Sequence, residues 1–362
     1  MSSTEEELKN IRTQIDSLDE QIIDLIQRRA SFAKEIGRVK KNSNDPIYRP
    51  DREREVYEKV SKKSNGPLPP SVIRAIYREM MSGTIALEHP LKIGYLGPEG
   101  SFSHEALRTK FGSSIDSFPL PTIPDVFRAV ESSQLDYGIV PVENSTEGQV
   151  SSTLDMFLET EVTIYSELYK KIQFSLLGFN SDLKTIEKVY GIRIGNEQCR
   201  NWISANLAHA EVIETSSTAM AAKTVAELKE GAAIASKIAG ETYGLEIIRE
   251  GIEDYSGNTT RFLVIGKTHC PATGNDKTSI VFSLANKSGA LFSVLQKFNE
   301  HSVNLSKIES RPLKKNRWEY NFFIDFVGHK DEPKIKQILD SIRVECLGYR
   351  MLGSYPLTET NV

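Results

Sequence analysis

The chain has 362 residues, of which 39% are hydrophobic and 26% are charged, and these values are typical of folded globular domains. Its 45 Lys and Arg against 49 Asp and Glu give a net charge of −4, so no basic surplus indicates a nucleic-acid or membrane-surface partner. At roughly 100 to 200 residues per domain, this length predicts two or three domains.

Cysteine usage and the first residues bear on the compartment. Cys199, Cys270 and Cys346 are odd in number and widely spaced, which is the pattern of neither a disulfide framework nor a metal-binding Cys pair. The opening MSSTEEE lacks the basic and apolar regions of an export signal, and no stretch of about 18 apolar residues occurs. We therefore expect a cytoplasmic protein that is neither exported nor membrane-spanning.

Apolar residues recur at alternating steps of three and four from Leu8 to Val39, as in the heptad seam of a helix that packs against another helix. Thr4 opens a capping-box pattern and no proline occurs before Pro46, so the sequence predicts one helix of about 37 residues. A helix of this length needs a partner. The seam position 29 holds an arginine in place of an apolar residue.

Arg29 shares its helix face with a second cation. Lys40 lies eleven residues later, which at about 100° per residue places it within about 20° of Arg29. A seam arginine that reaches the surface or pairs with a carboxylate is the structural alternative. Arg12 points about 100° away from Arg29, so we expect it to serve the site of a neighbouring chain.

Two more helices follow in the first 90 residues. Pro50 and the acidic residues beside it start one, the loop at residues 65–70 ends it, and Ser71 opens the third. Thr84 and Glu88 are four residues apart, so they share one side of the third helix near its end. The pattern predicts a three-helix module with inward-facing charged residues.

These helices resemble the all-helical chorismate mutase family over roughly residues 5 to 90. The resemblance rests on residues that occur in the family's order, namely Arg12, Arg29, Lys40, Arg52, Glu53, Thr84 and Glu88. It implies an intertwined dimer in which the long helix carries an arginine to the other subunit's site. It also implies a pericyclic rearrangement of chorismate to prephenate without covalent intermediate or metal, driven by a held compact conformer and by stabilised charge at the breaking ether bond.

In that scheme Arg12 and Arg29 bind the two substrate carboxylates, Lys40 donates to the ether oxygen, and Glu53 accepts from the ring hydroxyl. Glu88 also donates to the ether oxygen, which a carboxyl group does only when protonated. The implied catalytic residues are Lys40 and Glu88. The implied chorismate-binding residues are Arg12, Arg29, Lys40, Arg49, Arg52, Glu53, Thr84 and Glu88, although Arg49 departs from the acidic residue of some family members.

The next segment has an α/β pattern. Residues 91–97 read as a buried strand that runs into a turn and a helix start at Pro98. Its glycines have the wrong spacing for a dinucleotide loop, and residues 116–122 are rich in proline instead of forming a second strand that ends in an acidic residue. We therefore expect no dinucleotide cofactor.

Two polar runs lie at strand ends in this segment. Residues 142–148 follow a short apolar strand at its carboxyl end, where open α/β sheets bind ligands, and residues 257–261 immediately precede another strand. Turn chemistry explains either run taken alone.

Taken together, the runs GPEGSFS at 97–103, VENSTEG at 142–148 and TRF at 260–262 resemble the three signatures of the prephenate dehydratase family, over about residues 92 to 267. The resemblance implies two α/β lobes with the site in the cleft, and decarboxylation of prephenate with loss of its ring hydroxyl to give phenylpyruvate. Thr260 matches the family's essential threonine, and a threonine is a poor acid, so we expect it to relay or orient the proton. The implied prephenate-binding residues are Asn144, Ser145, Thr146, Gln198 and Arg261; a structural ion pair is the alternative for Arg261.

One run departs from that family. Residues 190–199 read YGIRIGNEQC, where many relatives carry Ser-His-Pro-Gln before a Gln-Cys pair. Gln198 and Cys199 match, whereas the Ser, His and Gln do not. Arg193 as a substitute ligand for a substrate carboxylate is a hypothesis that rests on its charge alone.

After a turn-rich linker, the C-terminal part has the order strand, helix, strand, strand, helix, strand, which is typical of a ferredoxin-like fold. Gly289-Ala-Leu opens its first helix and Glu309-Ser-Arg-Pro ends its second strand, a pair of motifs that resembles the ACT regulatory domain. The resemblance implies an L-phenylalanine site at a dimer interface, with the ligand carboxylate at the helix N-terminus. The implied residues are Gly289, Ala290, Leu291, Glu309, Ser310, Arg311 and Pro312.

The sequence thus predicts a multidomain fold: an all-α mutase domain at 1–90, a two-lobed α/β dehydratase domain at 91–267, a linker at 268–277 and a ferredoxin-like α+β ACT domain at 278–362. We expect a bifunctional enzyme of phenylalanine biosynthesis that is at least a homodimer, is inhibited by L-phenylalanine and uses no metal or cofactor. Two alternatives stay open. One is a non-catalytic amino-acid-binding regulatory protein, supported only by the altered residues 191–194, and the other is a mutase with an impaired dehydratase.

Overall fold

The computed structural model describes residues 3–40, 46, 48–312 and 320–358. The chain forms two compact units. Residues 1–49, 55–91 and 111–116 make the first unit, and residues 50–54, 92–110 and 117–362 make the second. No helix in the described ranges has an apolar stretch long enough to cross a bilayer.

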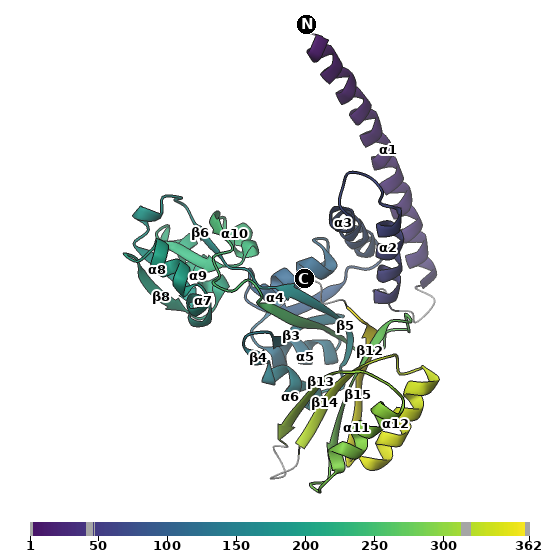
Figure 1. Cartoon of the computed structure of the whole chain (residues 1–362). Helices are drawn as coiled ribbons and strands as arrows, with labels where there is room; N and C mark the ends of the chain where they lie inside the picture. Colours follow the sequence, from purple (N-terminus) through teal and green to yellow (C-terminus); the bar gives the residue numbers. More distant parts are fainter. Residues whose placement is uncertain (1–2, 41–45, 47, 313–319, 359–362) are drawn as a thin grey trace. The chain divides into compact units, whose positions relative to one another are not determined.

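The first unit is built from helices, namely α1 (Ser3–Lys40), most of α2 (Pro50–Lys63) and α3 (Pro70–Glu88). The prediction of one long first helix is confirmed, and its N-terminal half extends past α2 and α3 (Figure 1). Its apolar seam is open to solvent: Leu8, Leu18 and Leu25 are 49%, 56% and 59% exposed. The seam therefore has the composition of a buried surface without being buried in this chain.

The C-terminal end of α1 packs closely on α3. A Cβ atom placed on Gly37 would lie 2.9 Å from Cγ of Glu88, so the glycine permits the two helices to approach at this point. This contact sets the position of Glu88 against the end of α1.

The second unit contains the two α/β lobes that the sequence predicts. The first lobe has a sheet in the order β2-β1-β3-β11-β5, with β4 paired to β3, and β11 runs antiparallel to both of its neighbours. Its elements are β1 (Lys92–Leu96), α4 (Phe102–Phe111), β2 (Asp116–Leu120), α5 (Ile123–Glu131), β3 (Tyr137–Asn144), β4 (Gly148–Gln149), α6 (Ser151–Glu159), β5 (Thr163–Lys171) and β11 (Thr259–Gly266).

One expectation about this lobe is wrong. The proline-rich residues 116–122 were expected not to form a strand, yet Asp116–Leu120 is strand β2. It lies at the edge of the sheet, where Pro119 costs little because no hydrogen bond to a further strand depends on its missing N–H.

The second lobe has a separate sheet in the order β10-β6-β9-β7-β8. The chain enters this lobe after β5 and returns from it just before β11, so two crossings connect the lobes. Its elements are β6 (Ser175–Gly178), the 3₁₀ turn at Leu183–Thr185, β7 (Lys188–Ile192), α7 (Arg193–Gln198), α8 (Arg200–Asn206), β8 (Glu211–Thr215), α9 (Thr218–Leu228), β9 (Ala232–Ala235), α10 (Lys237–Tyr243) and β10 (Glu246–Glu250).

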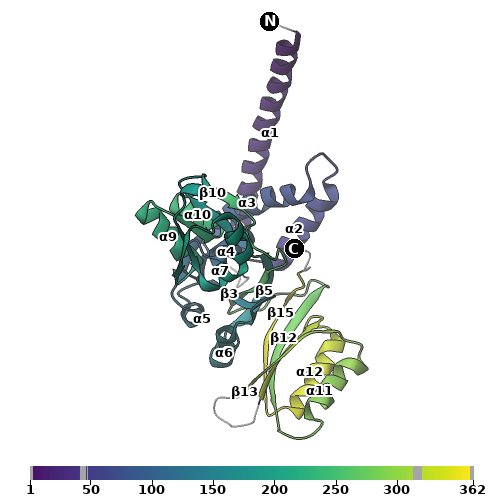
Figure 2. The same ribbon diagram turned by 60° about the vertical axis from the view of Figure 1, so that its left-hand side comes forward.

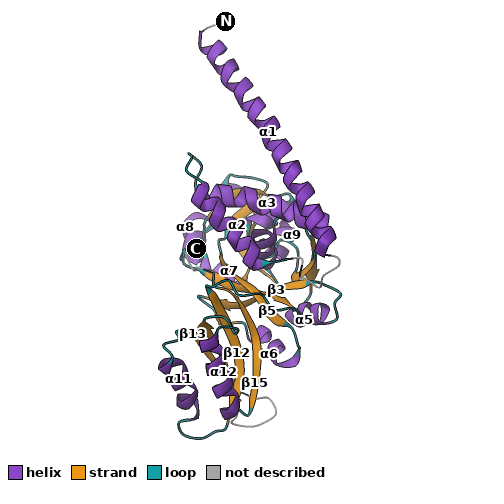
Figure 3. Cartoon of the chain, turned by 90° about the vertical axis from the view of Figure 1, so that its right-hand side faces the viewer, coloured by secondary structure: helices purple, strands orange, loops and turns teal. Residues whose placement is uncertain are grey.

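The C-terminal part confirms the predicted ferredoxin-like order. Its antiparallel sheet has the order β13-β14-β12-β15, and α11 and α12 cover one face (Figures 2 and 3). The elements are β12 (Asp276–Leu284), α11 (Ala290–Glu300), β13 (Leu305–Pro312), β14 (Tyr320–Val327), α12 (Pro333–Glu345) and β15 (Gly348–Pro356).

A buried charge cluster joins the sheet of the first α/β lobe to the ferredoxin-like sheet. Arg261 on β11 donates through Nε to Glu167 at 2.8 Å, through Nη1 to Asp325 at 2.6 Å and through Nη2 to the hydroxyl of Tyr355 at 3.0 Å. Lys277 donates to the other oxygen of Glu167 at 2.9 Å. Two cations and two carboxylates therefore balance inside the protein, as buried charges must.

Substitution of Glu167 tests how much this cluster stabilises the second unit. Glu167→Gln leaves two buried cations facing a single carboxylate, so we expect the free energy of unfolding to fall by about 3–5 kcal/mol. Urea unfolding of the full chain, followed by circular dichroism, measures this change. The control is Glu230→Gln, which breaks the solvent-exposed pair with Lys188 and should lower the free energy of unfolding far less than Glu167→Gln does. Equal effects of the two substitutions would contradict the expectation.

Candidate functional site

The helical unit places a cation and an acid near each other at the end of α1. Lys40 occupies the last residue of α1 and Glu88 the last of α3. Burial raises the pKa of Glu88, and the nearby charge of Lys40 only partly opposes this rise. A carboxyl group in this position keeps its proton to a higher pH than an exposed one, as a hydrogen-bond donor requires.

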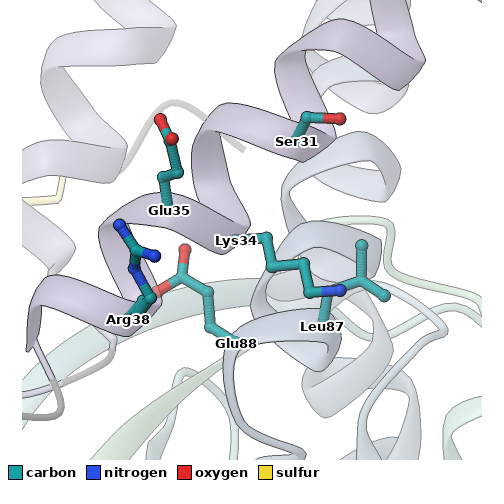
Figure 4. Close-up of a pocket in the computed structure, with 7 residues that line it drawn as sticks. Ser31, Lys34, Glu35, Arg38, Leu87 and Glu88 are labelled. Carbon is teal, nitrogen blue, oxygen red and sulfur yellow. The ribbon is translucent and has the colours of Figure 1, made fainter.

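Glu88 also lines a pocket of about 390 Å³ between α1 and α3. Figure 4 shows its side chain pointing toward α1 near Arg38, while Lys34 extends over Leu87. Sequence reasoning missed Lys34 and Arg38. They are four residues apart, so their helical spacing was the available signal.

Arg29 lies eleven residues before Lys40 on α1 and is partly buried. Its Nη1 atom is shielded from solvent and has no hydrogen-bond partner among the described residues. The described residues therefore do not show the alternative for Arg29, in which it pairs with a carboxylate of its own chain. A partly buried guanidinium with an unused, shielded donor suits an anionic ligand.

The other predicted mutase residues lie apart from this group. Arg12 is seventeen residues before Arg29, about 25 Å away along the helix axis, and is exposed. Glu53 belongs to the second unit, where it pairs with Lys110 at 2.8 Å. Thr84 is buried and donates to the carbonyl of Met81. Arg49 is the N-cap of α2, and Arg52 lies in its first turn.

In the dehydratase lobes, strand pairing brings two predicted residues together. Antiparallel pairing of β3 with β11 sets Asn144 opposite Thr260, and Asn144 Nδ2 donates to Thr260 Oγ1 at 2.8 Å. Because the threonine oxygen accepts this bond, its own proton remains available for another acceptor. The side-chain oxygen of Asn144, Oδ1, accepts three hydrogen bonds. Two come from the backbone N–H and the hydroxyl of Thr146, and the third comes from the backbone N–H of Glu147.

Gln198, at the end of α7 in the second lobe, completes a ring of side chains. Its Nε2 approaches Thr146 Oγ1 at 3.4 Å, and its Oε1 accepts from Asn258 Nδ2 at 2.8 Å. Asn258 Oδ1 in turn accepts from Asn144 Nδ2 at 2.7 Å. Asn258 lies in the polar run at residues 257–261, but the sequence predicted no role for it, because its partners are distant in the sequence.

Ser145, Arg193 and Arg261 do not join this ring. The Ser145 hydroxyl accepts from the N–H of Thr259 and donates to the carbonyl of Gly257, which anchors the loop after β3. Arg193 is exposed at the start of α7. Alternation along β11 turns Arg261 to the face opposite Thr260, into the buried charge cluster, so the structure favours the ion-pair alternative for this residue.

The two predicted regulatory motifs lie at the same end of the ferredoxin-like sheet. Pro312 and Leu284 are both in register with Tyr320, and Leu284 ends the strand that leads to Gly289. Gly289 is the N-cap of α11 with a φ of 81°, a conformation that favours glycine. The N–H groups that open α11 are oriented for an anion.

Strand β13 also contacts the segment that follows the polar ring. Arg311 donates to Ser151 Oγ at 2.8 Å and to Asp155 at 3.2 Å, both in the first turns of α6. Lys307 donates to Glu143 at 2.9 Å and to Gln149 at 2.7 Å. Arg350 on β15 donates to backbone carbonyls at the other end of α6, those of Phe157, Thr160 and Val162.

These parts define a class of multidomain protein in which an all-α module precedes a two-lobed α/β module and a ferredoxin-like module. Family models match in this order, as chorismate mutase type II at residues 11–89, prephenate dehydratase at 93–270 and ACT domain at 278–344. The chain is 44% identical over 355 residues to the bifunctional chorismate mutase/prephenate dehydratase of Aquifex aeolicus, covering 97% of this chain and 98% of the relative. The chain belongs to the bifunctional chorismate mutase/prephenate dehydratase family.

Two solved structures share the α/β and ferredoxin-like parts. Prephenate dehydratase from Arthrobacter aurescens, in complex with L-Phe, has a TM-score of 0.67 and 30% identity, covering 74% of this chain and 90% of that one. A protein described as a novel type of quorum quenching acylase has a TM-score of 0.69 and 27% identity, covering 75% of this chain and all of that one. The same fold therefore carries different chemistries, and the side chains of the site must distinguish them.

With Glu88 in its predicted role as a hydrogen-bond donor, its raised pKa predicts a pH-dependent mutase rate. We expect the rate of chorismate consumption to fall as pH rises through the pKa of Glu88, because only the protonated acid donates to the ether oxygen. Glu88→Gln should flatten the profile, since an amide donates at every pH. Glu35→Gln, which alters a carboxylate of the same pocket, is the control and should keep the wild-type profile. An unaltered profile in Glu88→Gln would remove Glu88 from the mechanism.

Proposed function

We propose that this chain converts chorismate to prephenate in residues 1–90, converts prephenate to phenylpyruvate in residues 91–267, and is inhibited by L-phenylalanine bound to residues 278–362, beyond a linker at 268–277. The observation that carries the proposal is the Asn144–Thr260 pair. In this pair the Thr260 hydroxyl accepts a hydrogen bond from Asn144, which supports a role in which Thr260 donates its own proton to the substrate. We place the enzyme in the cytoplasm, with no metal or cofactor in either reaction.

For the first reaction, Arg12 and Arg29 bind the two carboxylates of chorismate. Lys40 and protonated Glu88 donate to the ether oxygen as its bond to carbon breaks, and this donation stabilises negative charge that exists only in the transition state. The unused Nη1 donor of Arg29 and the raised pKa of Glu88 support these roles. The remaining binding residues in the proposal are Arg49, Arg52, Glu53 and Thr84.

For the second reaction, Thr260 donates its hydroxyl proton toward the ring hydroxyl of prephenate, which leaves as water. The bond to the ring carboxylate breaks at the same time, and its electron pair enters the ring as carbon dioxide departs, so that the product ring is aromatic. Asn144, Ser145, Thr146 and Gln198 hold the substrate's polar groups. A threonine does not supply a proton unaided, so the pair with Asn144 sets the direction of its O–H while solvent returns the proton that leaves in water.

We assign the exposed seam of α1 to a second copy of the chain. Its apolar residues recur at heptad spacing over most of the helix, which matches a helix of identical sequence. Arg12 lies on this exposed half, too far from Arg29 of its own chain to share a ligand with it. A dimer built through α1 therefore completes each mutase site with an arginine of the other copy.

We assign L-phenylalanine to the end of the ferredoxin-like sheet where both motifs lie. The N-terminus of α11, with Gly289, Ala290 and Leu291, takes the carboxylate of the amino acid. Strand β13 supplies Glu309, Ser310, Arg311 and Pro312, and its Arg311 also reaches α6 of the dehydratase lobe. A ligand that competes for Arg311 therefore acts directly on the region of the second reaction.

One assay on purified protein distinguishes this proposal from its alternatives. Chorismate and then prephenate are supplied, and phenylpyruvate is followed with and without L-phenylalanine. We expect both conversions, with inhibition of the second. A regulatory protein without catalysis would perform neither, and a mutase with an impaired dehydratase would stop at prephenate.

Thr260→Val removes the hydroxyl and conserves the shape of the side chain. We expect the dehydratase rate to fall by about 10²–10⁴ while the mutase rate of the same protein is unchanged, because the hydroxyl serves only the second reaction. Thr260→Ser is the matched control and should retain most of the activity. A Thr260→Val rate within threefold of wild type, on the order of an ordinary surface change, would contradict the assignment.

Mixed dimers test the shared mutase site. We expect Arg12→Ala and Arg29→Ala to be inactive alone, and their co-expressed mixture to regain about a quarter of the wild-type mutase rate, because half of the dimers are mixed and each holds one intact site. Differently tagged copies allow the mixed dimers to be purified and assayed. If both arginines act within one chain, the mixture stays as inactive as either variant.

A further inference from the structure

Asn258 lies where the two lobes of the dehydratase region meet. It precedes β11, on the segment that returns from the second lobe to the first. Its backbone carbonyl accepts from the N–H of Ile172 at 2.9 Å, and Ile172 follows β5 on the other crossing. The two crossings are also joined by the N–H of Ile252 and the carbonyl of Phe174 at 3.0 Å. The backbone of Asn258 is therefore fixed at the junction of the lobes.

The side chain of Asn258 uses both ends of its amide across this junction. Its oxygen accepts from Asn144 of the first lobe at 2.7 Å, and its nitrogen donates to Gln198 of the second lobe at 2.8 Å. Asn258 is 3% exposed, so these bonds are made without competition from solvent. A side chain that both accepts and donates is needed here, because Asn144 presents a donor and Gln198 presents an acceptor.

The bond to Asn144 bears directly on Thr260. Asn144 has two amide hydrogens, one bonded to Asn258 and the other to Thr260. Its carbonyl oxygen meanwhile accepts three bonds from Thr146 and Glu147. The amide is thus held from both ends, and loss of Asn258 frees one hydrogen and lets the group rotate away from Thr260. The direction of the threonine O–H then becomes variable.

We propose that Asn258 is a positioning residue of the prephenate reaction: it ties Gln198 to Asn144, and through Asn144 it keeps Thr260 oriented for proton donation. Asn258 touches no substrate in this role. The ring of Asn144, Thr146, Gln198 and Asn258 holds residues of both lobes in one arrangement, so the polar groups of the site are set before prephenate binds. The inference rests on the proposed dehydratase activity, which the wild-type rate tests separately.

The test compares Asn258→Ala with Asn258→Asp by steady-state kinetics on prephenate. Alanine removes both bonds, and we expect kcat to fall about 100-fold with KM changed less than about threefold, because orientation is lost but no substrate contact is. Aspartate still accepts from Asn144, but it loses the bond to Gln198 and sets a carboxylate oxygen against the Gln198 Oε1 atom. We therefore expect its kcat to lie between those of the alanine variant and wild type. The chorismate mutase rate of the same molecules should be unchanged and reports folded, active protein.

Asn206→Ala is the matched control. Asn206 lies in the second lobe, is exposed, and makes one side-chain hydrogen bond, to the carbonyl of Trp202 at 2.9 Å, outside the ring. We expect its dehydratase kcat within about twofold of wild type, as for other surface substitutions.

A double-mutant cycle with Gln198→Ala gives a second measure. If Asn258 and Gln198 act as one unit, the double variant loses no more kcat than the more damaging single variant. Multiplied losses would mean that the two residues act separately. The proposal is also overturned if Asn258→Ala keeps kcat within about threefold, or if the alanine and aspartate variants lose kcat equally together with thermal stability, which would describe a residue that only stabilises the fold.

Discussion

Strand β11 contributes side chains to two different environments, a polar ring on one face and a buried charge cluster on the other. Much of the second unit packs around this strand. Successive side chains of a strand point to opposite faces, so Thr260 and its neighbour Arg261 cannot share a site. Thr260 meets Asn144 and the polar ring, while Arg261 enters a cluster with Glu167 and Asp325 that is almost free of solvent. Burial raises the pKa of Asp325, but Arg261 and Lys307 outweigh burial and hold it below its usual value. The cluster is stable only as a balanced set of charges.

Because Asp325 and Tyr355 belong to the ferredoxin-like sheet, this cluster makes that sheet part of the surroundings of the dehydratase strand. Three basic side chains extend the connection. Lys307 reaches the end of β3 beside Asn144, and Arg311 reaches the start of α6. Arg350 reaches backbone carbonyls at the C-terminal end of α6 and just beyond it. A continuous set of polar contacts therefore connects the ferredoxin-like sheet to the lobe that holds Asn144 and Thr260. Whatever changes the position of β13 changes the contacts of Glu143, the neighbour of Asn144.

In the described part of the helical unit, the charged residues are not paired in a buried cluster of this kind. Long helices tolerate cations in an apolar seam when a ligand or a partner supplies the counter-charge, and Arg29 has an unused, shielded donor. Burial against α1, where Gly37 leaves room for the side chain, raises the pKa of Glu88. Here the burial of a single carboxyl group, rather than a network of charges, shifts the pKa.

Local patterns in the sequence determined much of this. Heptad spacing predicted α1 as a single helix, and the pattern of strands and helices predicted the ferredoxin-like order. The two α/β lobes and their shared site were implied by the family resemblance of the runs at residues 97–103, 142–148 and 260–262. These signals are carried by residues close together in the chain. Only the tertiary structure decided which side chains meet across long separations: Arg261 with Glu167 and Asp325, and Asn258 with Asn144 and Gln198. Charge or an amide group gives each of these residues many possible partners, and strand pairing and the lobe crossings select among them.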